Sequence, residues 1–172
     1  MAKSNIVVVC LIKNVKEQFA SALAEKLEMC FVSTDDMFQK EEGGVKELLD
    51  NFGSKYFENI EKQTLSAIKN FENTVVVSNA PTLFSQENLK KIKNNCLVLY
   101  LQINFKVFKK IKNENLTEAN RAKLIMDEIV FAERDKLYCQ NADIVVDGSS
   151  LKLKKAIKKA VKGIKSYYKS KK

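Results

Sequence analysis

The sequence predicts an α/β protein in which helices cover both faces of a parallel sheet. The runs Ile6–Val9 and Val75–Val77 are apolar at every position, as expected for strands that are buried on both faces. Segments with helical periodicity separate such runs, and alternating strands and helices form parallel sheets. The chain has one proline, Pro81, and no linker-like stretch, so we interpret residues 1–172 as a single domain.

Five strands are expected from the apolar and β-branched runs. In chain order they are Asn5–Cys10, Met29–Ser33, Thr74–Ser78, Cys96–Gln102 and Asp143–Asp147. Ligands of such sheets bind beyond the carboxyl ends of the strands. The expected site is therefore formed by the segments after the first three strands, which are Leu11–Gln18, Thr34–Asp36 and Asn79–Pro81.

Helices are expected between these strands and after the last one. The first helix, Lys16–Glu28, has an apolar side that includes Phe19 and Leu23. The others are Val45–Phe52, about Lys55–Phe71, Gln86–Asn94, Asn104–Lys112, about Ala122–Tyr138 and a last helix from Ser150 onward. The last helix carries an apolar stripe that includes Ile157 and Ile164, as a helix docked on the sheet would.

The net charge of +9 is concentrated at the C-terminal end of the chain. Residues 151–172 contain ten lysines and no acidic residue, which leaves 20 basic and 21 acidic residues in the rest. Such a helix suits binding to nucleic acid or to an anionic membrane surface. We favour a docked helix whose lysines face water, because the apolar stripe is what docking requires. Only two arginines, Arg121 and Arg134, are present to grip phosphates.

Several classes of site are excluded by composition. Histidine is absent, which removes Ser-His and Cys-His nucleophile systems and the commonest general base. Cys10, Cys30, Cys96 and Cys139 are widely spaced, so no zinc site is expected. No apolar run approaches the roughly 18 residues that span a bilayer, and we expect a cytoplasmic, monomeric protein.

Five segments, in order, carry a recognisable pattern. The connection after the first strand contains Lys16, and the second strand leads into FVSTDDMF. A central segment reads NFGSKYFENIE, the third strand continues as VVVSNAPTLF, and a later segment reads ERDKLYCQNADIVVD. Together these segments resemble the shikimate kinase family of P-loop phosphotransferases. The residues of the last segment that match the family's closing pattern are Arg134, Leu137, Tyr138, Ala142 and Asp143.

The resemblance implies a three-layer αβα fold of the P-loop kinase type, with a five-stranded parallel sheet in the order 2-3-1-4-5. It implies a lid near residues 113–123 and leaves residues 163–172 as a lysine-rich tail. For an active member it implies Mg-ATP as cofactor and shikimate as substrate.

The connection after the first strand lacks the glycines of a phosphate loop. A working loop has the form GxxxxGK[ST], and its glycines adopt positive φ and let backbone amides approach the phosphates. Aligned on Lys16, the two glycines are Cys10 and Val15, the magnesium-binding hydroxyl is Glu17, and a further family glycine is Lys13. Valine resists positive φ, and we expect Lys13, Val15 or Glu17 to fill the space of the β-phosphate. The resemblance assigns the nucleotide to Lys13, Asn14, Val15, Lys16, Glu17, Gln18 and Lys110 and the metal to Glu17 and Ser33.

The segment after the second strand keeps one of two family carboxylates. The resemblance implies that the first carboxylate supports magnesium and that the second accepts the proton of the substrate hydroxyl. These positions are Ser33 and Asp35, so the candidate catalytic residues are Asp35, as base, and Lys16. Asp35 fits a helix cap equally well.

The substrate positions are altered as well. By resemblance, Glu58 replaces an arginine that binds the substrate carboxylate, and a carboxylate there repels the substrate. Asn79, Ala80 and Pro81 replace three glycines, and proline removes a backbone donor. Arg134 matches a second substrate-binding arginine, although a surface arginine on a helix is the alternative.

These changes affect the nucleotide, metal and substrate positions, while the strand runs and helix stripes are intact. We therefore interpret the chain as a shikimate kinase-like pseudoenzyme that needs no cofactor and has a binding or regulatory role toward a small molecule or a protein. The first alternative is an active kinase of shikimate or another small molecule that uses Mg-ATP, with Lys13, Lys16 and Lys109 replacing backbone amides. The second is a protein that binds nucleic acid or another anionic surface through its last helix.

Overall fold

The computed structural model describes residues 5–34, 66–68, 70–77, 86–112 and 121–170. Its sheet has five parallel strands in the order β2-β3-β1-β4-β5, which confirms the expected fold class and strand order. The strands are β1 (Asn5–Val9), β2 (Cys30–Ser33), β3 (Thr74–Val77), β4 (Cys96–Gln102) and β5 (Ile144–Asp147).

The central strand, β1, is buried on both faces. It pairs with β3 through Ile6↔Val75 and with β4 through Ile6↔Leu97. Because successive side chains of a strand point to opposite faces, β1 divides its residues between two hydrophobic clusters, Ile6 and Val8 in one, Val7 and Val9 in the other. The continuous apolar run is explained by this burial on two sides.

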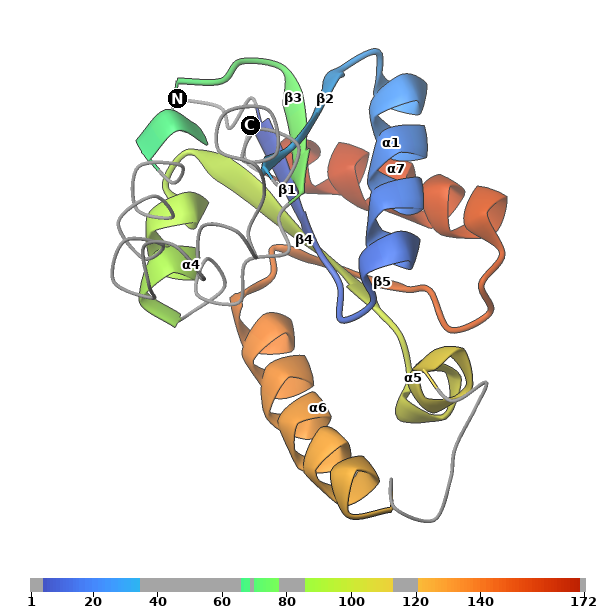
Figure 1. Cartoon of the computed structure of the whole chain (residues 1–172). Helices are drawn as coiled ribbons and strands as arrows, with labels where there is room; N and C mark the ends of the chain where they lie inside the picture. The colour runs from blue at the N-terminus through green and yellow to red at the C-terminus, as the bar shows by residue number, and fades with distance from the viewer. Residues whose placement is uncertain (1–4, 35–65, 69, 78–85, 113–120, 171–172) are drawn as a thin grey trace.

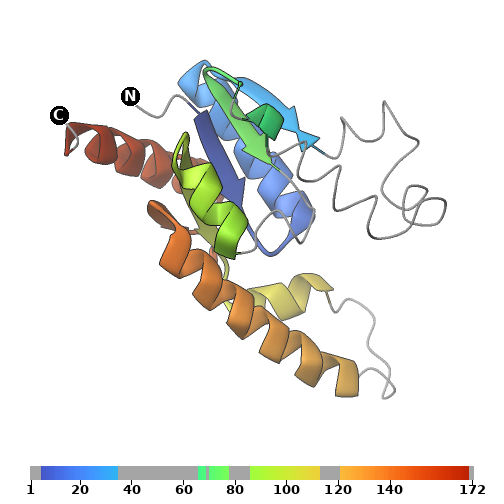
Figure 2. The same cartoon turned by 90° about the vertical axis from the view of Figure 1, so that its left-hand side faces the viewer.

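Helices form a layer on each face of the sheet (Figure 1). One layer consists of α1 (Lys13–Leu27) and α7 (Leu153–Lys169), which cross one another. The other consists of α4 (Gln86–Lys93) and α6 (Arg121–Asn141). Helix α5 (Phe105–Lys112) lies beyond the end of β4, beside the middle of α6, where Phe105 and Phe108 contact Phe131 (Figure 2). Among the described residues, no helix combines the length and the apolar character that crossing a membrane requires.

Helix α1 differs at both ends from the expected Lys16–Glu28. It begins three residues early, at Lys13, because a segment without glycine or proline can continue the helix toward β1. It ends at Leu27, since Glu28 takes a left-handed conformation (φ 55°). The Met29 N–H then donates to the Ala24 carbonyl at 2.9 Å, which closes the helix in the usual six-to-one manner.

Two later helix boundaries also differ. Helix α6 continues to Asn141, three residues past the expected Tyr138. Helix α7 begins at Leu153 and not near Ser150, because a turn precedes it in which the Leu151 N–H donates to the Gly148 carbonyl.

Other expectations fall wholly or partly outside the described residues. The helix Val45–Phe52 does so entirely, and of the helix expected to run from about Lys55 to Phe71 only residues 66–68 are described as helical. Of the expected lid, residues 121–123 belong to α6 and the remainder lies outside the description.

Candidate functional site

Only three residues, Cys10, Leu11 and Ile12, connect β1 to α1. Ile12 is the N-cap residue of α1, and its side chain makes no capping hydrogen bond. The Lys16 N–H donates to the Ile12 carbonyl at 3.0 Å, as in any α-helix. Among the described non-glycine residues, positive φ occurs only at Glu28, Asn73 and Leu151, so this connection contains no left-handed turn.

Lys16 and Cys10 lie close together beneath the surface. Lys16 is 3% exposed and Cys10 is 8% exposed. Burial raises the pKa of the Cys10 thiol to about 11, although the nearby Lys16 ammonium acts in the opposite direction. Cys10 is therefore a neutral thiol at physiological pH, and it occupies the position where the family pattern has its first glycine.

Lys13 and Glu17 face solvent on the first two turns of α1. The Lys13 Nζ lies 3.9 Å from the Glu17 Oε1. The expected helix start at Lys16 placed Glu17 in the first turn. Because the helix begins at Lys13, Glu17 lies in the second turn. Asn14 and Gln18 are on this helix too, and Val15 packs partly buried against the core.

Two buried hydroxyls end β2. Ser33 is 6% exposed and Thr34 is fully buried, and neither hydroxyl oxygen has a hydrogen-bond partner among the described residues. Buried hydroxyls normally find partners, so this pair is the clearest unsatisfied polar feature in the described part of the chain. The next candidate residue, Asp35, lies outside the described residues, as do Glu58 and Asn79–Pro81.

No group of three or more His, Cys, Asp or Glu side chains is arranged to hold a metal within the described ranges. Of the two positions that the sequence analysis assigned to the metal, Glu17 has a carboxylate that pairs with Lys13, and Ser33 has only a hydroxyl. Magnesium prefers carboxylate oxygens, phosphates and water.

Most of the residues that match the family's closing pattern are structural. Leu137, Tyr138 and Ala142 pack in the cluster on the α4 and α6 side of the sheet. Asp143 joins β5 to β4, because its Oδ2 accepts from the Val98 N–H at 2.9 Å. Arg134 is exposed, and its charge favours ionisation of Tyr138, whose pKa is nevertheless raised by burial.

A polar cluster between β4 and α6 was not predicted. The Tyr100 hydroxyl donates to the Asp135 Oδ1 at 2.6 Å, and the Gln102 Nε2 donates to both Asp135 oxygens at 3.1 and 3.2 Å. Burial, and then the bond to Asp135, raise the pKa of Tyr100 well above its usual value. The sequence offered only a weak signal for this cluster. Asp135 follows Arg134 in an expected helix, and Tyr100 and Gln102 lie near the end of an expected strand.

Helix α5 carries two lysines that the sequence analysis connected with a nucleotide, Lys110 by resemblance and Lys109 in the active-kinase alternative. Lys109 and Lys110 are both exposed. The Lys109 Nζ lies over the Phe105 ring, 5.9 Å from its centroid, within range of a cation–π contact. Lys109 thus already has an aromatic neighbour of its own.

Comparison with known proteins identifies the family. The shikimate kinase family model matches residues 15–165. A shikimate kinase from Persephonella marina is 32% identical over 145 residues, covering 81% of this chain and 86% of the relative. A shikimate kinase from Aquifex aeolicus is 29% identical over 136 residues, covering 77% of this chain and 80% of the relative.

Solved structures show the same fold. The crystal structure of shikimate kinase from Aquifex aeolicus superposes with a TM-score of 0.78 at 23% identity, covering 94% of this chain and 96% of that one. The Acinetobacter baumannii shikimate kinase, solved in complex with shikimate, gives a TM-score of 0.75 at 19% identity, with coverage of 96% and 94%.

Proposed function

The chain belongs to the shikimate kinase family, and we propose that within this family it is a pseudoenzyme with a binding or regulatory role, in which Mg-ATP no longer binds at the β1–α1 connection. The hydrogen bond from the Lys16 N–H to the Ile12 carbonyl is the observation that carries the proposal. This bond closes the first turn of α1, so residues 13–15 are helical where a phosphate loop would need an open turn.

The backbone amides support this proposal. A phosphate loop presents several amides to one polyphosphate, including that of the conserved lysine. Here the Lys16 amide is used inside α1, and the N–H groups of the first turn are the ones left without helical acceptors. A bare helix N-terminus attracts anions, but it does not surround them as a glycine-rich turn does.

Reopening the turn would also disturb packing. Val15 packs against the core cluster, and Cys10 lies within it. Unwinding residues 13–15 would expose the valine side chain and break the first helical hydrogen bonds. The folded arrangement thus opposes the loop conformation through burial as well as through backbone preference.

The metal positions support the same conclusion. Glu17 replaces a neutral hydroxyl with a carboxylate that pairs with Lys13, and Ser33 replaces a carboxylate with a hydroxyl. A negative charge beside the triphosphate repels it, while a serine supplies no charge to hold a cation. These residues do not fit bound Mg-ATP.

Two buried hydroxyls mark the edge of the sheet at which we propose that a small polar molecule binds. The Ser33 and Thr34 hydroxyls can each donate and accept a hydrogen bond, and no described residue bonds to either of them. Their position at the carboxyl end of β2 is where sheets of this class bind ligands. We therefore assign the binding role to this edge of the sheet.

Isothermal titration with Mg-ATP and a shikimate phosphorylation assay test the proposal. We expect neither micromolar binding nor turnover. Micromolar binding accompanied by phosphorylation of shikimate would refute the pseudoenzyme and support an active kinase whose lysines replace the backbone amides. Turnover of a different small alcohol would refute it equally.

A further inference from the structure

We propose that the groove between α1 and α7 docks an amphipathic helix of a protein partner, with acidic side chains on the flank that faces α7. The groove lies on the outer surface of these two helices and not at the carboxyl edge of the sheet. The inference therefore does not depend on the proposed function.

The floor of the groove is apolar. Ala22 of α1 and Leu153, Ile157 and Val161 of α7 line a space of about 770 Å³. Leu153 is 40% exposed, so a large apolar side chain is left uncovered there. The α7 residues from 153 to 161 span roughly 12 Å, about two helical turns, which matches a short helix laid into a groove.

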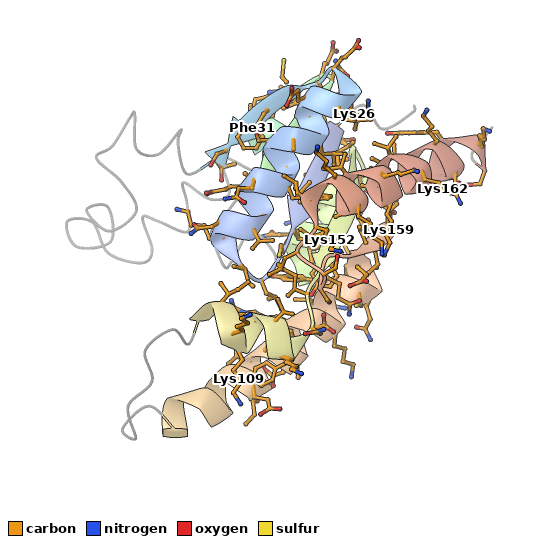
Figure 3. The ribbon with its side chains drawn as sticks, turned by 90° about the vertical axis from the view of Figure 1, so that its right-hand side faces the viewer. Lys26, Phe31, Lys109, Lys152, Lys159 and Lys162 are labelled. Atoms are coloured by element: carbon orange, nitrogen blue, oxygen red, sulfur yellow. The ribbon has the colours of Figure 1, made fainter. Side chains whose placement is uncertain are left out.

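The two walls carry different charges. The α7 wall presents Lys154 and Lys158, which are four residues apart and lie on one side of the helix. The α1 wall presents Glu25 and Glu28 together with Lys26. Figure 3 looks onto this face and shows α1 and α7 crossing, with Lys26 near the end of α1.

These charges favour a polypeptide over a polyanion. Glu25 and Glu28 repel a nucleic-acid backbone or an anionic lipid surface that covers the α1 wall, and Lys26 offsets only one of these two charges. A helix has two separate flanks, so it can place acids opposite Lys154 and Lys158 and basic residues opposite the glutamates. Its apolar stripe then covers Leu153 and the rest of the floor.

Selection from a displayed library of amphipathic helices tests the proposal. The library keeps a leucine stripe at positions i, i+3, i+4 and i+7 and varies the flanking positions between Glu and Lys. The full chain is the target, and the dissociation constant of each enriched peptide is measured by fluorescence anisotropy. We expect enrichment of peptides with Glu on one flank and Lys on the other.

Two charge-reversal variants locate the binding site. Lys154→Glu with Lys158→Glu should weaken the enriched peptides roughly tenfold, because two attractions become repulsions at the rim of an apolar contact. The matched control, Lys155→Glu with Lys162→Glu, makes the same change of charge on exposed α7 residues that do not line the groove. It should leave the affinity within roughly twofold.

Three results would overturn the proposal. The first is the absence of any enriched helix, and the second is equal weakening by the two double variants, which indicates attraction to the overall charge of α7. The third is binding to poly(U) RNA or to vesicles of equal parts phosphatidylglycerol and phosphatidylcholine that is tighter than peptide binding. That result would assign this face to a polyanion.

Discussion

Rebuilding the phosphate loop is the most direct perturbation of the β1–α1 connection. The substitutions are Cys10→Gly, Lys13→Gly, Val15→Gly and Glu17→Ser, which restore the family pattern around Lys16. We expect the variant to lose stability in the absence of nucleotide and to gain affinity for Mg-ATP. We expect no shikimate turnover, because Ser33 and Glu58 are unchanged.

The size of the destabilisation follows from the structure of α1. Glycine at positions 13 and 15 costs roughly 1 kcal/mol each in a helix, and removal of the partly buried Val15 side chain costs roughly 1 kcal/mol more. Loss of the Lys13–Glu17 ion pair, 3.9 Å long and partly exposed, adds a few tenths of a kcal/mol. Loss of the buried Cys10 side chain adds roughly 1 kcal/mol more, and a total of roughly 4 kcal/mol lowers the melting temperature of a domain of this size by about 12 °C.

Thermal unfolding with and without Mg-ATP measures both effects. Nucleotide at about 100 times its dissociation constant adds about 2.7 kcal/mol of stability, so it should restore most of the lost melting temperature. The unmodified chain should show no shift. A control with alanine in place of each glycine, together with Glu17→Ser, removes the same side chains and restores no loop.

The reasoning fails if the melting temperature of the unmodified chain rises with Mg-ATP, since its connection would then bind the nucleotide without glycines. It also fails if the four substitutions leave the stability unchanged, because residues 13–15 would then contribute nothing as helix.

Asp135→Ala should lower the unfolding free energy measured in urea by roughly 2 kcal/mol, because the buried Tyr100 hydroxyl loses its acceptor. Adding Tyr100→Phe should recover part of that loss, and equal stabilities of the single and double variants would contradict this. The raised pKa of Cys10 means that the folded chain keeps a proton which the unfolded chain releases above pH 9.0. Its unfolding free energy should therefore fall by roughly 2 kcal/mol between pH 9.0 and about 11, a loss that a Cys10→Ala variant should not share. Gly148→Ala should lower the melting temperature, because the new Cβ would lie 2.7 Å from the Cδ1 of the buried Leu101. Overpacking of this kind costs roughly 1–3 kcal/mol, and an unchanged melting temperature would show that Leu101 moves aside.

The fold could be predicted because its signals are local. Runs that are apolar at every position, such as Ile6–Val9, indicate strands covered on both faces, and β1 lies between two helical layers as expected. The strand Cys96–Gln102 was predicted to the residue. Helix ends were predicted less well, since the start of α1 depends on whether Lys13–Val15 close hydrogen bonds or form a loop.

The candidate site could be predicted only in part. Lys16, Glu17 and Ser33 follow from their places after the first two strands. Tyr138 and Asp143 were interpreted as markers of a family pattern. That interpretation did not reveal that Tyr138 packs in the core and that Asp143 joins β5 to β4. The roles of Asp35, Glu58 and Asn79–Pro81 stay predictions, because these residues lie outside the described part of the chain.

The order of apolar and polar residues was by itself enough to predict a sheet between two helical layers. The lack of glycine after β1 was by itself enough to predict a connection without the backbone freedom of a phosphate loop. Only the tertiary structure decided how Tyr100 meets Asp135 across 35 positions and how Asp143 holds Val98 across 45. It also decided that α1 and α7 form a groove with differently charged walls. Such pairings depend on how packed helices lie against the sheet, and no spacing along one segment encodes that arrangement.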